Sequence, residues 1–166
     1  MIFRVSEKLG KKIYAGKLKA LPLDANPLAD WSAHLFFVKR TQCIIIYNTS
    51  TLYSCVMYGS GITDTGRFIE RAAFCIRIFM EWDGKEFIYV RFMIPIMGSV
   101  QFAKPLDKST IGSVNELVKV ATRILQDETI APFDVGTELN QILLSSIATK
   151  DDLGYCTPYD AFKRIV

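Results

Sequence analysis

Residues 31–58 read WSAHLFFVKRTQCIIIYNTSTLYSCVMY, and this stretch decides the fold. It contains three apolar runs, which are separated by polar residues at 39–42 and at 48–50. Runs of this length, joined by turn-forming residues, predict a three-stranded antiparallel meander. Because Ile44, Ile45 and Ile46 are consecutive rather than alternating, both faces of the second strand should be covered, which predicts a central strand.

Two long helices are predicted after the meander. The first begins at Asp64 or Thr65, either of which can cap it, and ends at about Trp82. The second spans residues 114–126, because a capping-box sequence precedes apolar residues at helical spacing.

Shorter elements are predicted in the remaining segments. Residues 86–94 are rich in aromatic and β-branched residues and predict a strand that pairs with another at 100–104, with a helix as the alternative for 86–94. A strand at 2–5, a short helix at 6–13 and a final helix that begins at Thr157-Pro158 complete the expected elements.

Length and composition predict one domain that spans residues 1–166. A chain of 166 residues can fill one hydrophobic core, and 50% of these residues are hydrophobic. Strands dominate the first two thirds and helices mostly follow them, so the predicted class is α+β. The expected architecture is a mainly antiparallel sheet with the two principal helices packed on one face, around a single shared interior.

The sequence predicts a cytoplasmic protein. Each apolar stretch is interrupted by a charged residue or glycine well before the roughly 18 residues that a membrane span needs, so no membrane partner is expected. The first residues lack the pattern of a secretion signal. The four cysteines are far apart, without a CxxC pair, and are expected to be buried reduced thiols. With one histidine in the chain, no metal or other cofactor is predicted.

Basic residues are concentrated in the first quarter of the chain. Residues 1–40 carry eight Lys and Arg against three Asp and Glu. Basic and aromatic side chains also alternate at 40–47 and 89–92, as they do on sheets that bind nucleic acid. A solvated basic face and a half-buried strand give the same patterns, so nucleic-acid binding is the weaker interpretation.

A glycine-rich loop at 59–66 lies between a predicted strand and a predicted helix, where phosphate-binding loops occur. Gly59, Gly61 and Arg67 are the anion-binding candidates in this loop. The spacing departs from the dinucleotide-binding and P-loop patterns, and Asp64 at the helix start would repel a phosphate. A plain turn is therefore the interpretation that the residues favour.

The sequence contains no recognisable catalytic set and does not decide whether the protein is an enzyme. It has neither a serine nucleophile elbow nor an HExxH motif. His34 is the sole histidine, and strand alternation places it on the same face as Phe36 and Val38. Because a lone histidine in an apolar strand is more often structural than a general base, no catalytic residue is predicted.

The chain contains four short motifs. They are D-W-x-A-x-L at residues 30–35, N-x-x-T-L-[YF]-S at 48–54, R-F-I-E-R-A at 67–72 and G-S-x-N-[DE] at 112–116. With these motifs the chain resembles a family of uncharacterised bacterial proteins that has no assigned function. The resemblance covers most of the chain and implies a bacterial, intracellular α+β protein of unknown role. The family often has Asn-Arg-Ser where this chain has Asp107-Lys108-Ser109, so no site on that loop is carried over.

Polar and amphipathic residues at predicted strand ends and at one helix start are the candidates for a polar site. The alternative is that Asn48 and Asn115 serve turns and caps, while Asp30 and Arg40 pair on the surface. The candidate cluster comprises Asp30, Trp31, His34, Arg40, Asn48, Thr51, Arg91 and Asn115.

Three functional hypotheses follow from these observations. The leading one is a non-catalytic binding or assembly module, in which a homodimer buries part of the apolar surface. The second is a nucleic-acid-binding protein that uses the basic first quarter. The third is an anion- or nucleotide-binding enzyme that uses the loop at 59–66.

Overall fold

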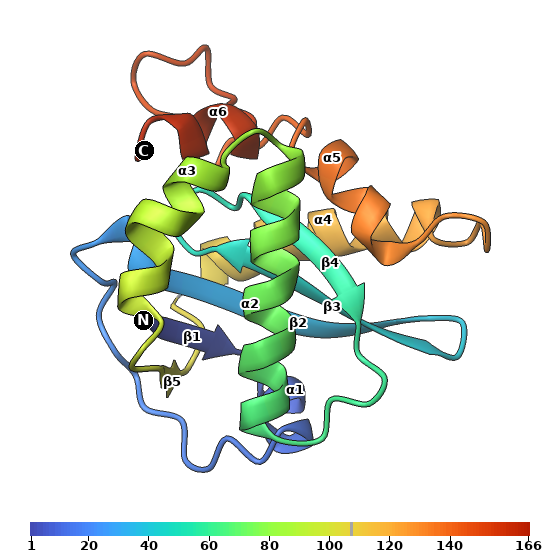
Figure 1. Cartoon of the computed structure of the whole chain (residues 1–166). Coiled ribbons are helices and arrows are strands. Elements are labelled where there is room, and N and C mark those ends of the chain that lie inside the picture. The colour runs from blue at the N-terminus through green and yellow to red at the C-terminus, as the bar shows by residue number, and fades with distance from the viewer. Residues whose placement is uncertain (107) are drawn as a thin grey trace.

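A computed structural model describes residues 1–106 and 108–166, and its centre is a five-stranded mixed sheet (Figure 1). Asp107, part of the departure from the family pattern, lies outside the described residues. The strands are β1 (Ile2–Val5), β2 (Asp30–Val38), β3 (Thr41–Asn48), β4 (Ser54–Tyr58) and β5 (Gln101–Ala103). They are ordered β4-β3-β2-β1-β5, and the longer pairs, β2–β3 and β3–β4, are antiparallel. The predicted α+β class and the mainly antiparallel sheet are confirmed.

The meander of β2, β3 and β4 is the predicted one. Trp31 of β2 lies opposite Asn48 of β3, and Ile46 of β3 lies opposite Cys55 of β4. The three consecutive isoleucines of β3 are fully buried, which confirms that both faces of this strand are covered. The middle position of the whole sheet belongs to β2, because β1 and β5 extend the sheet on its far side.

The β1 strand is inserted between β2 and β5 and runs parallel to both. Val5 lies opposite Ala33 of β2, and Arg4 lies opposite Ala103 of β5. The chain between β1 and β2 passes the outer edge of β5, where Lys19 bridges Ala103. Because β1 and β5 are parallel neighbours, their carboxyl ends lie at the same end of the sheet.

The strand predicted at residues 86–94 is wrong, and the alternative prediction of a helix there is correct. This segment is helical, as α3 (Glu86–Ile88), η2 (Tyr89–Met93) and η3 (Ile94–Ile96), and β5 pairs with β1 instead. Tyr89 and Met93, four residues apart, are the buried residues of η2, and the Tyr89 hydroxyl donates to the Ala73 carbonyl of α2 at 3.3 Å. Packing against α2 thus overrides the strand propensity of the aromatic residues.

The helix α2 (Thr65–Trp82) agrees with the prediction. The Asp64 carboxylate accepts a hydrogen bond from the Arg67 backbone N–H at 2.9 Å, which caps the helix. At its other end, Gly84 has a φ of 70°, in the left-handed region that glycine adopts without strain.

The second long helix, α4 (Lys108–Ile124), begins earlier than predicted. Ser113, the first residue of the predicted capping box, and Asn115 both lie inside the helix, so neither caps it as predicted. The Ser113 hydroxyl instead donates to the Ser146 hydroxyl at 2.6 Å. The shorter helices are α1 (Glu7–Lys12), η1 (Pro27–Ala29), η4 (Pro132–Asp134), α5 (Val135–Leu139) and α6 (Pro158–Lys163), of which α1 and α6 have the predicted caps Ser6 and Thr157.

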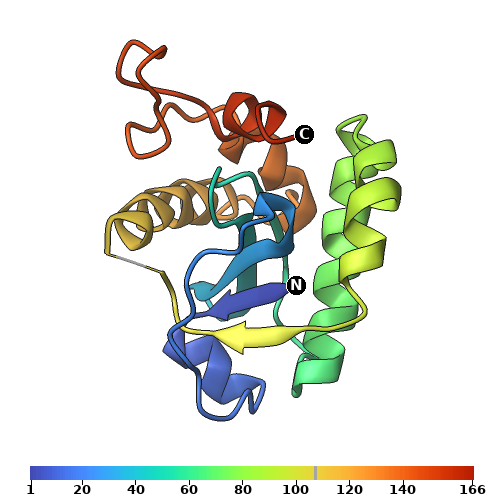
Figure 2. The same cartoon turned by 90° about the vertical axis from the view of Figure 1, so that its left-hand side faces the viewer.

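The two long helices lie on opposite faces of the sheet, not on one face as predicted (Figure 2). The α2 residues pack with Ile44 and Ile46 in one hydrophobic cluster, whereas the α4 residues pack with Ile45 in the other. The apolar side chains therefore form two layers on either side of the sheet rather than the single interior that was expected. The physical reason is the alternation of side chains along a strand, which sends adjacent isoleucines to opposite faces.

We expect the same substitution to have opposite effects at two glycines. A Cβ atom at Gly136 in α5 would lie 2.5 Å from Cε2 of Phe79, which is buried, whereas a Cβ atom at Gly112 in α4 meets no atom within 4 Å. Gly136→Ala should lower the free energy of unfolding by about 1–3 kcal/mol through overpacking. Gly112→Ala should raise it by roughly 0.5–1 kcal/mol, because alanine favours the helix. Urea denaturation measures both, and equal effects of the two changes would contradict this packing.

Candidate functional site

Three of the candidate polar residues, Asp30, Asn48 and Thr51, belong to one buried network, and Asp30 is its centre. Arg4 Nε donates to Asp30 Oδ1 at 2.8 Å, and Arg4 Nη2 donates to Oδ2 at 2.7 Å. Both side chains are at most 1% exposed. The Thr49 hydroxyl donates to Asp30 Oδ1 at 2.7 Å, and the Asp24 backbone N–H donates to Oδ2 at 3.1 Å. Asp30 thus has a buried partner in Arg4, and the predicted surface pair of Asp30 with Arg40 is wrong.

The remaining polar atoms of this network also have partners. Arg4 donates further to the backbone carbonyls of Leu21 and Pro22, at 2.9 and 2.7 Å. Asn48 Oδ1 accepts from the backbone N–H and the hydroxyl of Thr51, at 3.1 and 3.0 Å, which confirms the predicted turn role of Asn48. Because every donor described here is used internally, this network stabilises the fold and offers little to a ligand.

The other candidates are dispersed over the fold. Trp31 is buried in the α2-side cluster, where its indole N–H donates to the Leu28 carbonyl at 3.0 Å. Arg91 is exposed on η2. Arg40 lines a shallow depression of about 580 Å³ together with Gly61.

The glycine-rich loop uses its polar groups for its own structure. Asp64 occupies the start of α2, and the hydrogen bond from the Arg67 backbone N–H holds the pKa of its carboxyl below the usual value. The Arg67 and Arg71 guanidinium groups donate to the carbonyls of Gly61 and Ser60, at 3.4 and 3.2 Å. An anion at this helix start would have to displace the Asp64 carboxylate.

A second buried cluster was not anticipated from the sequence. The Tyr53 hydroxyl donates to Asp83 Oδ2 at 2.7 Å, and Lys85 forms an ion pair with the same carboxylate. Lys85 Nζ also lies 4.0 Å from the centre of the Tyr159 ring. Burial, and then the hydrogen bond to Asp83, raises the pKa of Tyr53 well above its ordinary value, so its hydroxyl stays protonated. This cluster connects the residue before β4, the residues that follow α2, and α6.

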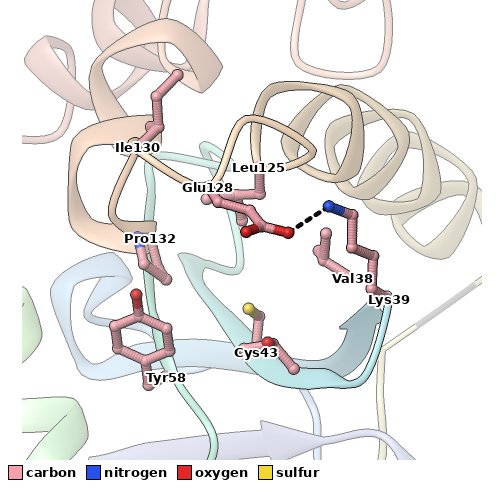
Figure 3. A pocket seen from close by; sticks show the side chains of 9 residues that line it. Val38, Lys39, Cys43, Tyr58, Leu125, Glu128, Ile130 and Pro132 are labelled. Atoms are coloured by element: carbon pink, nitrogen blue, oxygen red, sulfur yellow. Dashed lines mark hydrogen bonds and ion pairs between the residues drawn. The ribbon is translucent and has the colours of Figure 1, made fainter.

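One pocket lies beside the β2–β3 hairpin (Figure 3), with a volume of about 270 Å³. Lys39 and Glu128 form a 2.5 Å ion pair there, so their charges compensate each other. Cys43 lies in the wall beneath them, and burial raises the pKa of its thiol. A protonated thiol and a closed ion pair leave this pocket without an available charge.

A larger, open cleft of about 860 Å³ lies at the ends of β1 and β5, and we call it the switch-point cleft. After β1 the chain enters α1, which lies beyond the ends of the strands and whose Leu9 and Ile13 pack in the α2-side cluster. After β5 the chain enters α4, which lies on the face opposite α2 (Figure 2). Ligands favour the crevice that forms where two neighbouring parallel strands continue to opposite faces of a sheet. The cleft is lined by Val5, Glu7, Gly10, Lys11, Tyr14, Gly16, Lys17, Leu18, Lys104, Pro105 and Ile111.

The charged residues of the cleft are mostly basic. Lys11 pairs with Glu7 at 2.7 Å, but Lys17 and Lys104 have no ion-pair partner among residues 1–106 and 108–166. Tyr14 is 82% exposed and has a φ of 54°, a backbone conformation that favours glycine. The cleft therefore combines apolar walls with two available cations and an exposed aromatic ring.

Two of the predicted site residues, His34 and Asn115, come together in a smaller pocket of about 210 Å³. This pocket shares Glu7, Pro105 and Ile111 with the switch-point cleft. Burial, and then the charge of Lys8, lowers the pKa of His34, so its imidazole is neutral at neutral pH. Sequence reasoning found these two residues but missed Tyr14, Lys17 and Lys104, since only the parallel pairing of β1 with β5 brings them to one cleft.

The described residues contain no group of three or more His, Cys, Asp or Glu side chains that could hold a metal ion. All four cysteines are buried and free, as predicted. No helix in the described part of the chain has the length and apolar content that a membrane crossing needs.

The fold and the cleft define an α+β protein with a mixed sheet and an opening at the ends of two parallel strands. Over residues 2–161 the sequence matches a family described as a domain of unknown function, DUF6933, and the chain belongs to this family. A search of curated proteins finds no match.

The buried ion pair gives a testable prediction for stability. Asp30→Asn should lower the free energy of unfolding by about 3–5 kcal/mol, because it leaves the Arg4 guanidinium buried without its counter-charge. Glu116→Gln is the matched control, since Glu116 belongs to an exposed pair with Lys119 and should change stability by less than about 1 kcal/mol. Chemical denaturation measures both changes, and a mild effect of Asp30→Asn would show that this ion pair does not support the fold.

Proposed function

We propose that this chain is a non-catalytic binding module that holds a small anionic molecule with an apolar body in the switch-point cleft. The observation that carries the proposal is the cleft itself, which lies where β1 and β5 end and their chains diverge to opposite faces. Its volume of about 860 Å³ falls within the range of roughly 300–1,000 Å³ that is typical of small-molecule sites.

The lining of the cleft supports an amphipathic anion as the ligand. Val5, Leu18, Pro105 and Ile111 supply apolar contact area. The ammonium groups of Lys17 and Lys104 carry positive charge that no described acidic residue neutralises. An anionic group beside the lysines and an apolar body against the walls would satisfy both features.

Chemistry of the described side chains supports binding rather than catalysis. His34 has no hydrogen bond to a carboxylate in the described part of the chain that would orient it as a general base. Burial raises the pKa of Cys43 and Cys156, and a hydrogen bond with Cys75 together with burial does the same for Cys55. Protonated thiols are weak nucleophiles at neutral pH.

We place this module in the bacterial cytoplasm. Four buried free cysteines suit a reducing compartment, in which thiols persist without pairing.

Binding in the cleft can be tested with naphthalene-2-sulfonate, a planar apolar anion. A ligand of this size should bind with a Kd on the order of 1 mM, from ~0.3 kcal/mol per non-hydrogen atom. In ¹H–¹⁵N spectra we expect the largest shifts at the backbone amides of Gly10, Gly16 and Leu18. The double variant Lys17→Glu, Lys104→Glu should weaken binding at least roughly tenfold, because it reverses the charge of the cleft. Chemical-shift changes scattered over the surface would refute the proposed site. Undiminished binding of naphthalene-2-sulfonate to the double variant would refute it as well.

A second proposal is that two copies associate through the outer side of residues 86–94. Phe87, Val90, Phe92 and Ile94 are 73, 52, 45 and 52% exposed there, which is unusual for large apolar side chains. Glu86 and Arg91 are exposed on the same segment, so a two-fold related copy can place the acid of one opposite the base of the other.

Light scattering after gel filtration tests this association. The protein should elute as a dimer at micromolar concentration, and Phe87→Glu should convert it to a monomer, because a buried unpaired carboxylate opposes the contact. Phe74→Glu is the matched control, since Phe74 is 64% exposed on α2 and outside this segment. A wild-type monomer at all concentrations would exclude the proposed dimer.

Nucleic-acid binding draws less support from the structure than from the sequence. Among the eight basic residues of the first quarter, Arg4, Lys11 and Lys39 form ion pairs with acidic side chains. Arg4 is moreover fully buried. The surface charge left for a phosphate backbone is therefore smaller than the sequence count suggests.

A further inference from the structure

The smaller pocket and the switch-point cleft form two adjoining compartments. Glu7, Pro105 and Ile111 line both, so a molecule in the cleft can extend one end between α1 and α4 toward β2. The charged lysines Lys11, Lys17 and Lys104 line only the larger compartment. The two compartments therefore differ in the chemistry that they offer.

His34 and Asn115 are two of the five polar residues that line the smaller pocket, and the others are Ser6, Glu7 and Tyr47. Neither His34 nor Asn115 makes a side-chain hydrogen bond to another residue within the described ranges 1–106 and 108–166. A neutral imidazole has one donor and one acceptor nitrogen, and the asparagine amide has both kinds of group. The walls around them are largely apolar, formed by Ala33, Ile111 and Val114. Such a pocket can match a ligand that carries both hydrogen-bond donors and acceptors.

The volume of this pocket restricts the ligand to a small ring. It measures about 210 Å³, and a protein cavity of ~150 Å³ accommodates benzene. A single nitrogen-containing aromatic ring fits this space and supplies polar ring atoms to His34 and Asn115. Tyr14, exposed in the larger compartment, can stack on any further planar part of the ligand.

We propose that the His34–Asn115 pocket determines ligand specificity by binding a single-ring nitrogen heterocycle, whose anionic substituent lies in the switch-point cleft beside Lys17 and Lys104. This inference rests on the proposed function, because it needs the cleft to hold the anionic group. It adds the class of ligand, a heteroaromatic anion, and the residues that select it.

The test compares matched pairs of small anions by NMR titration of the full chain. The heterocyclic probes are nicotinate, UMP and CMP, and the partners that lack the ring nitrogen or the ring are benzoate and ribose 5-phosphate. At least one heterocyclic probe should bind tenfold or more tightly than its partner, because unpaired polar groups in the pocket penalise a ligand that cannot hydrogen-bond. It should also shift the backbone amides of Ser6, Ala33 and Val114.

Two variants separate recognition of the ring from attraction of the anion. His34→Phe and Asn115→Leu should each remove the preference for the heterocycle, without weakening the binding of benzoate, and should leave the affinity for ribose 5-phosphate unchanged. The control Glu116→Gln, one residue away on the outer surface of α4, should retain the preference. Thermal unfolding of each variant establishes that it folds, and Asn115, which is exposed, can be replaced without opening a core.

The outcomes distinguish this inference from the proposed function. If naphthalene-2-sulfonate binds in the cleft but every heterocycle binds no better than its partner, the specificity pocket is refuted and the cleft remains. If neither naphthalene-2-sulfonate nor any heterocycle binds there, both are refuted. A preference for heterocycles that survives His34→Phe and Asn115→Leu would also overturn the inference.

Discussion

The ion pair between Arg4 and Asp30 is the interaction on which the rest of this structure depends. It joins β1 to β2 on the face opposite Phe3 and Trp31, and it is bidentate and almost completely buried. The same guanidinium holds the carbonyls of Leu21 and Pro22, so it also fixes the long connection between the two strands. A short strand of four residues, inserted parallel between two others, has few backbone hydrogen bonds of its own, and this network holds it in register.

The position of β1 in turn creates the switch-point cleft. Because β1 and β5 are parallel neighbours, both end at the same edge, and the chain leaves them toward opposite layers. The cleft is thus a consequence of the strand topology. Lys17, in the connection between β1 and β2, and Lys104, which follows β5, give the cleft its positive charge. The buried network and the cleft have different roles. The network uses its polar groups internally, whereas the cleft offers the cations of Lys17 and Lys104 and the adjoining smaller pocket offers the side chains of His34 and Asn115.

The candidate site was predicted only in part. His34 and Asn115 were recognised as polar residues of a predicted strand and of a predicted helix start, and they do meet in one pocket. Asp30 and Asn48 were recognised in the same way, yet they belong to the structural network. Arg4 was overlooked, although a charged residue inside the apolar strand Ile2–Val5 is itself a signal of a buried partner.

The sequence by itself determined the meander, both long helices and most of their ends, because these depend on residues that are near one another in the chain. The three isoleucines already implied two covered faces, and Asp64, Ser6 and Thr157 marked helix starts through their own side chains. Only the tertiary structure decided that residues 86–96 are helical, that β5 pairs with β1, and that α2 and α4 take opposite faces. These features depend on contacts between residues far apart in sequence, whose packing energy overrides local preference and leaves no trace in local spacing.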